Sequence, residues 1–208
     1  MGATCVVMTT AYGAQFSFGI FLPYMEADTG WDRELISRAF AIYIYLYAFL
    51  SIVSGPLTDR LGPRPVIAAG GLLLGLGYWL LGRVESQWEL FAVLAVVLAA
   101  GMSASFVPCN STVVRWFVRE RGRALGITTA GASVGNMVAP PLAAMLIGAV
   151  GWRASFGWIG AGAAAVIVAA AMFTVRDPAD RGLLPDGDRH QDGAGGQDAE
   201  AAGQNGGG

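Results

Sequence analysis

Polar and aromatic side chains recur at helical spacing within long stretches that carry no charge. Tyr12, Gln15 and Phe16, for example, fall on one face of a helix. Amides and phenols are costly in an apolar environment unless they meet water, a ligand or one another. These side chains therefore favour either a polar path for a ligand or hydrogen bonds between helices. The full set is Tyr12, Gln15, Phe16, Tyr43, Tyr47, Asn110, Ser133 and Asn136.

A second pattern, Gly131-Ala132-Ser133-Val134-Gly135, matches the G-x-S-x-G motif of serine hydrolases. A serine nucleophile needs a base to accept its proton, and the only histidine, His190, lies in a polar tail. Two glycines four residues apart are instead typical of close helix packing, as are Gly71 and Gly75. With one histidine and two cysteines, the sequence predicts no enzyme, no metal site, no cofactor and no nucleic-acid partner.

The composition indicates a membrane protein. Charged residues make up 13% of the chain, against about 25% in ordinary soluble domains. Six stretches of 18 to 29 residues hold no Asp, Glu, Lys, Arg or His, and a helix needs about 20 apolar residues to cross a bilayer. We therefore predict an all-α membrane protein with a bundle over residues 1–175 and helices near 4–25, 38–58, 65–82, 89–113, 123–149 and 153–175.

Arginine placement predicts the orientation of this bundle. The second and fourth inter-helix loops, together with the tail, hold nine arginines, and the opposite side holds four. The positive side of a membrane protein faces the cytoplasm, so we expect both termini there, in a multi-pass protein of the plasma (inner) membrane. Residues 176–208 are acidic and, beyond about residue 187, too polar to form a core; we expect a disordered tail.

The turn over residues 55–65 holds the most informative charge. Asp59 is placed at the C-terminal end of the second helix, where the helix dipole disfavours an acid. We expect it to have a partner on another helix, in a part of the protein beyond these 208 residues; a solvated loop acid is the alternative. Gly62 suits the turn, and Pro65 suits the first position of the third helix.

This segment resembles the G-x-x-x-D-R-x-G-x-R signature of the major facilitator superfamily, although Pro63 replaces a usual basic residue. The matching residues are Gly55, Asp59, Arg60, Gly62 and Arg64. The segment 116–127 resembles a W-F-x-x-x-R-G-x-A-x-G run of the oxalate/formate antiporter and monocarboxylate transporter branch. We place in this second loop Trp116, Arg119, Arg121, Gly122, Arg123 and Gly126.

The resemblance implies the N-terminal half of a twelve-helix fold, built from three-plus-three inverted repeats, with substrate bound between two six-helix halves. It implies alternating-access transport of a small organic anion, such as a monocarboxylate or dicarboxylate. The polar and aromatic set above would then line the path, and residues 55–64 would control the conformational change. The required partner is a second six-helix half, either missing from this chain or supplied by another copy. A non-transporting scaffold and a homodimerising half-transporter remain alternatives.

Overall fold

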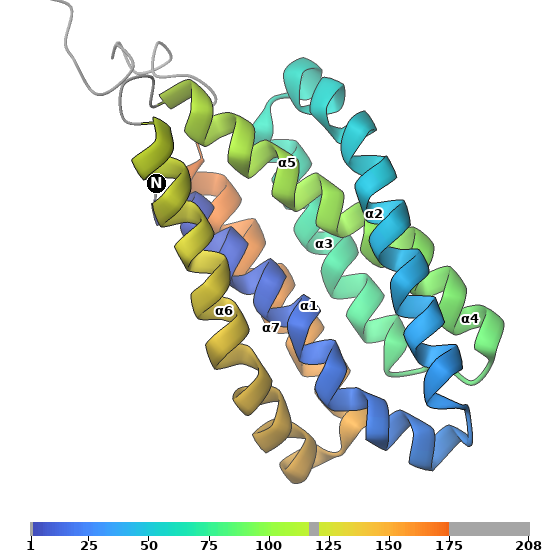
Figure 1. The fold of residues 1–208 in the computed structure, drawn as a ribbon. Helices are drawn as coiled ribbons and strands as arrows, with labels where there is room; N and C mark the ends of the chain where they lie inside the picture. Colours follow the sequence, from blue (N-terminus) through green and yellow to red (C-terminus); the bar gives the residue numbers. More distant parts are fainter. Residues whose placement is uncertain (1, 117–120, 175–208) are drawn as a thin grey trace, which may run out of the picture.

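Residues 2–116 and 121–174 are described in the computed structural model, in which long helices cross from one end of a bundle to the other (Figure 1). The fourth, fifth and sixth elements form one continuous helix, so the bundle has six helices long and apolar enough to cross a membrane. The predicted all-α architecture is confirmed, and the described residues contain no strand. The elements are α1 (Gly2–Thr29), α2 (Arg33–Leu61), α3 (Pro63–Leu81), α4 (Gln87–Ala92), η1 (Val93–Leu98), α5 (Ala99–Trp116), α6 (Arg121–Val150) and α7 (Trp152–Phe173). The predicted disordered tail lies outside the described residues.

Several helices extend beyond the uncharged stretches. α1 continues to Thr29 and α2 to Leu61, so that charged residues occupy their last turns in solvent. The prediction for the start of α3 is wrong, because the helix begins at Pro63 and not at Pro65. Both prolines fit the first turn, where a backbone N–H has no partner within the helix.

The fourth span contains a π-helical segment, η1, which no sequence signal indicated. Such a segment inserts an extra residue into a helical turn and is often found at functional sites. It leads into Leu98, against which Gly77 of α3 packs so closely that a Cβ atom there would lie 2.7 Å from the Leu98 side chain. The residues of η1 are uniformly aliphatic and lie against α2 and α3.

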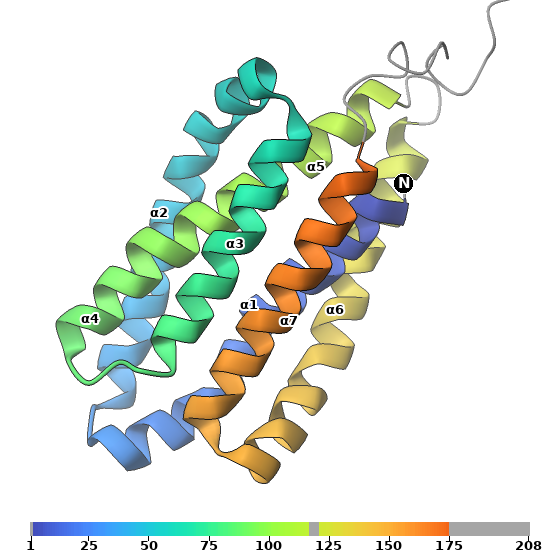
Figure 2. The ribbon, with the colours of Figure 1, turned by 180° about the vertical axis from the view of Figure 1, so that it is seen from behind.

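Close helix pairs account for the glycine motifs. α3 and α7 run antiparallel and side by side (Figure 2), and a Cβ at Gly75 would lie 2.6 Å from Ala164 and 2.9 Å from the Gly160 carbonyl oxygen. α1 and α6 run parallel, and a Cβ at Gly135 would lie 2.1 Å from the carbonyl oxygen of Thr9. The predicted packing role of these glycines is confirmed. Ser133 of the hydrolase-like motif lies inside α6 and not on a strand-to-helix turn.

Two turns at opposite ends of the bundle have the same backbone geometry. Gly62, between α2 and α3, has φ 87° and ψ 162°, and Gly151, between α6 and α7, has φ 80° and ψ 162°. Each donates its N–H to the carbonyl four residues earlier, Thr58 at 2.8 Å and Ile147 at 2.9 Å. The two turns therefore occupy equivalent places in the first three and the last three spans, as two inverted repeats require.

Gly62→Ala should lower the free energy of unfolding by about 1–3 kcal/mol, because this backbone region is essentially restricted to glycine. The measurement is denaturation of the purified chain in detergent, followed by circular dichroism. Gly162→Ala is the matched control, since Gly162 lies within α7 and a methyl group added there would have nothing within 4 Å. Equal stability of the two variants would contradict the assignment of strain to Gly62.

Candidate functional site

An aromatic cluster joins α1, α2 and α5. The Phe106 ring meets Tyr12 edge-on, with centroids 5.9 Å apart, and meets Tyr47 in the same way at 6.0 Å. Tyr12 stacks with Phe16 at 6.3 Å, and Tyr47 stacks with Tyr43 at 6.4 Å. The structure thus brings together the four aromatic residues singled out on the first two helices and adds Phe106 as the ring that connects them.

The cluster extends from the core to the surface of the bundle. Tyr43 is buried, Tyr12 and Tyr47 are half-buried, and Phe16 is 51% exposed. Sequence reasoning missed Phe106 because it considered polar groups on the fourth span. The available signal was its position four residues before Asn110, which places both on one helical face.

Two buried amide oxygens lie on the neighbouring helices α1 and α6. The side-chain oxygens of Gln15 and Asn136 are buried and have no hydrogen-bond partner within residues 2–116 and 121–174. A buried acceptor without a partner costs roughly 1–3 kcal/mol. The alternative of hydrogen bonding between helices is thus not observed for these two oxygens, and their place in a path remains a prediction.

Gln15→Met should leave the chain as stable or raise its free energy of unfolding by about 1–2 kcal/mol, because it removes an unsatisfied buried oxygen at nearly constant volume. Denaturation in detergent measures this. Gln87→Met is the control, because Gln87 is exposed at the start of α4 and should change stability little. A loss of more than about 1 kcal/mol at Gln15 would show that the amide supports packing.

The other predicted polar residues lie apart from the aromatic contacts. Ser133 is exposed, and its hydroxyl donates to the Thr129 carbonyl oxygen of its own helix at 3.5 Å. Asn110 is half-buried within α5, which continues to Trp116 and so extends beyond the predicted end near residue 113. In the described part of the chain, neither Ser133 nor Asn110 forms a hydrogen bond with an aromatic residue of the cluster.

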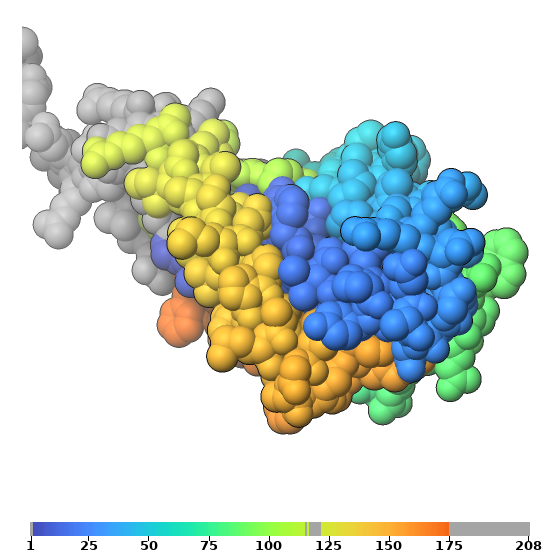
Figure 3. Space-filling view, turned by 60° about the horizontal axis from the view of Figure 1, so that its bottom comes forward, coloured from blue at the N-terminus to red at the C-terminus, as the bar shows by residue number. Residues whose placement is uncertain are grey.

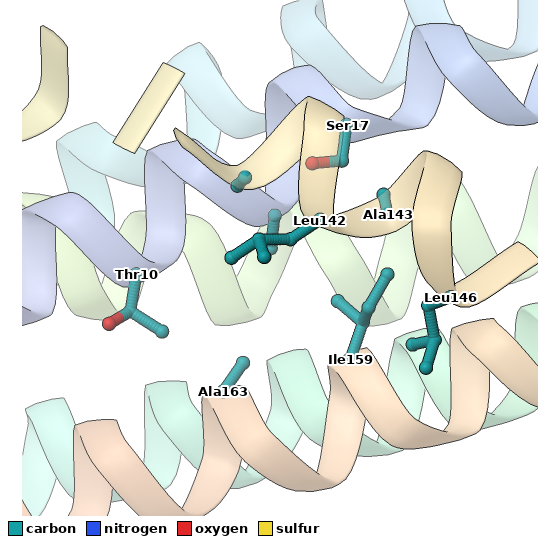
Figure 4. A pocket seen from close by; sticks show the side chains of 9 residues that line it. Thr10, Ser17, Leu142, Ala143, Leu146, Ile159 and Ala163 are labelled. Carbon is teal, nitrogen blue, oxygen red and sulfur yellow. The ribbon is translucent and has the colours of Figure 1, made fainter. Parts of the chain in front are cut away.

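A separate cavity of about 170 Å³ lies among α1, α6 and α7 (Figure 4). Leu142, Leu146 and Ile159 surround it, and its two hydroxyls belong to Thr10 and Ser17. Both hydroxyls donate to carbonyls of their own helix, Thr10 to Val6 at 2.9 Å and Ser17 to Gly13 at 2.7 Å. The lining residues therefore offer no free hydrogen-bond donor to an anion, and the cavity is suited to apolar groups.

The turn between α2 and α3 places its charges at one end of the bundle. Asp59 and Arg60 are exposed in the last turn of α2. Asp59 already has an interaction within this chain, and the predicted partner beyond the chain stays a prediction. Arg64, at the second position of α3, donates from Nε to the carbonyl oxygen of Thr174 just after α7.

The second predicted loop is partly helical. Gly122, Arg123 and Gly126 are exposed in the first two turns of α6, and Trp116 is half-buried at the end of α5. Among the described residues, a Cβ added at either glycine would have nothing within 4 Å, so neither mediates helix packing between them. Arg119 lies outside the described residues, as does the side chain of Arg121.

Comparison with known proteins agrees with this architecture. The family model of the Major Facilitator Superfamily matches residues 4–198, and the chain belongs to that family. The probable sulfoacetate transporter SauU of Cupriavidus necator is 30% identical over 162 residues, which cover 77% of this chain and 37% of that protein. Rat monocarboxylate transporter 13 is 28% identical over 142 residues, covering 68% of this chain and 33% of the relative. The probable L-galactonate transporter of Escherichia coli is 32% identical over 144 residues, which cover 65% of this chain and 30% of that protein.

These relatives confirm the resemblance found in the sequence, including its monocarboxylate branch. The chain spans about a third of the length of each of the three. The six long apolar helices and the family together identify a membrane protein of a transporter family and not an enzyme.

Proposed function

We propose that this chain forms the N-terminal six-helix half of a secondary active transporter that moves a small organic anion by alternating access. The aromatic cluster with the unsatisfied amide oxygens of Gln15 and Asn136 carries the proposal. In a transporter family, neutral polar and aromatic side chains placed together in this way are suited to line a solute path.

The names of three relatives support an organic anion as the substrate class. Sulfoacetate, monocarboxylates and L-galactonate are all organic acid anions. The uncharged stretches at the centre of the six spans hold no arginine in this chain. The cation that balances the substrate charge would therefore come from a second six-helix half, belonging to a longer chain or to another copy. Both termini would face the cytoplasm, as the distribution of arginines indicates.

Uptake into proteoliposomes containing the full-length protein tests this function. The panel contains radiolabelled sulfoacetate, lactate and galactonate, with riboflavin and a neutral sugar as non-acid controls. We expect saturable uptake of at least one acid and none of the neutral sugar. Gln15→Met should reduce that uptake without loss of stability. Uptake of the neutral solutes alone, or unchanged acid uptake by Gln15→Met, would contradict the proposed substrate class or path.

The need for a second half has its own test. The 208-residue chain reconstituted as monomers should show no flux of the acid that the full-length protein transports. Flux that appears only when two copies are covalently linked would identify a half that works as a homodimer. Flux from verified monomers would contradict the proposed two-half path.

A further inference from the structure

Arg153 links three segments at the end of the bundle opposite to the Gly62 turn. Its Nε and Nη2 atoms both lie 3.1 Å from Oδ2 of Asp28, in the last turn of α1. Its Nη1 atom donates to the Val84 carbonyl oxygen, in the turn after α3, at 3.2 Å. Arg153 itself is the second residue of α7. One guanidinium therefore joins the end of α1, the end of α3 and the start of α7.

The positions of these charges oppose their own helices. An acid near a helix C-terminus and a base near a helix N-terminus are each disfavoured by the helix dipole. Asp28 and Arg153 both occupy such positions, so neither residue stabilises the helix that carries it. The stability of the individual helices therefore does not explain why Asp28 and Arg153 occupy these positions. The connection that their ion pair makes between α1 and α7 does.

Arg153 has an equivalent at the other end of the α3–α7 pair. Arg64 and Arg153 both follow a glycine with φ near +80° by two residues and occupy the second helical position. Arg64 at the start of α3 donates to the Thr174 carbonyl oxygen after α7, and Arg153 at the start of α7 donates to the Val84 carbonyl oxygen after α3. The contacts are reciprocal, as the inverted relation of the two repeats requires.

The two ends differ in one respect among the contacts described. Arg153 also binds Asp28 and so includes α1, the helix that carries Tyr12, Gln15 and Phe16. A Cβ at Gly82 would lie 2.4 Å from the Arg153 carbonyl oxygen, so the backbone of this turn already fixes α3 against α7. Figure 3 shows this end of the molecule, where the blue end of α1 borders the yellow and orange segments of α6 and α7.

We infer that Arg153 is a positioning residue that holds the end of α1 against the α3–α7 pair, so that these three helices move as one body. Its importance for transport rests on the proposed function, because α1 carries the candidate path residues. Its structural role does not depend on any substrate.

Distance measurement between spin labels on the 208-residue chain tests this role. Labels are placed at Glu26→Cys on α1 and Glu85→Cys after α3, both exposed positions, with Cys5→Ser and Cys109→Ala replacing the native thiols. We expect one narrow distance distribution in the parent chain and a distinctly broader one in Arg153→Gln. Arg38→Gln is the control, since Arg38 pairs with Glu34 within α2 at the same end. Equal widths for the parent and Arg153→Gln would overturn the inference.

A charge exchange tests whether the ion pair itself positions α1. In the double variant Asp28→Arg with Arg153→Asp, the pair is retained and both charges agree with their helix dipoles. Its Tm should therefore return to within about 3 °C of the parent value. An aspartate cannot donate to the Val84 carbonyl oxygen, but the pair with α1 is retained and the Gly82 turn still fixes α3 against α7. The distance distribution should therefore narrow toward that of the parent, and a distribution as broad as that of Arg153→Gln would overturn the inference that this pair positions α1. Because the measurement needs no substrate, its failure would leave the proposed transport function standing.

Discussion

Asp59→Asn in the full-length protein should lower transport turnover by at least about tenfold, which corresponds to about 1.4 kcal/mol. Asp59 lies in the last turn of α2, where the helix dipole disfavours its charge. In the proposed alternating-access cycle, we expect the contacts of Asp59 with other helices to differ between states. Removal of the charge should alter the balance between those states and leave the substrate site intact.

Initial uptake rates over a range of substrate concentrations measure transport turnover, and equilibrium binding measures substrate affinity separately. Affinity should remain within about twofold of the parent, a change of about 0.4 kcal/mol. Asp32→Asn is the control, because Asp32 is an exposed acid at the opposite end of the same helix, without a side-chain capping bond. If both variants transport at the parent rate, Asp59 has no role in the conformational change.

Gly135→Ala should cause the largest loss of stability of the substitutions considered, at about 3 kcal/mol or more. The added methyl group would lie 2.1 Å from the Thr9 carbonyl oxygen and 3.1 Å from the Gly13 amide nitrogen. Both are backbone atoms of α1, so the conflict cannot be relieved by a side-chain rotation. α1 and α6 would have to separate, and the hydrogen bond from the Thr9 hydroxyl to the Gly131 carbonyl oxygen, now 2.8 Å, would weaken.

Thermal and chemical denaturation of the chain in detergent measure this loss. Gly148→Ala is the matched control, because Gly148 lies on the same helix with nothing within 4 Å of the added methyl. Gly131→Ala should fall between the two, since its nearest neighbour is the movable thiol of Cys5 at 2.6 Å. If Gly135→Ala fails to fold, Gly131→Ala should still be less stable than Gly148→Ala, because only Gly131 lies in the contact between α1 and α6. Equal stability of all three variants would contradict this close contact.

The six spans could be predicted because hydrocarbon excludes charge, and that exclusion is visible residue by residue. The ends of the helices could not, because charged residues such as Asp28 and Asp59 continue the helix into water. The π-helical segment depends on neighbouring helices, and its aliphatic sequence contains no sign of it.

The candidate site was predicted in part. Helical spacing identified Tyr12 and Tyr47 on separate helices, but their meeting through Phe106 depends on how α5 crosses α1 and α2. The contact of Arg153 with Asp28 joins residues 125 positions apart. The unfavourable position of Asp28 in the last turn of α1 became visible only in the structure, because the sequence predicted that this helix ends near residue 25.

The parallel contact between α1 and α6 has a consequence for biosynthesis. Thr9 must wait for Gly131, which is synthesised 122 residues later, before its hydroxyl can bond across the two helices. During insertion, the face of the first span that carries Cys5, Thr9 and Gly13 therefore lacks its α6 neighbour until the fifth span has been synthesised. The contact between α1 and α6 can therefore form only after the fifth span has entered the bilayer, and a ribosome stalled before that point would leave this face of α1 without its α6 neighbour.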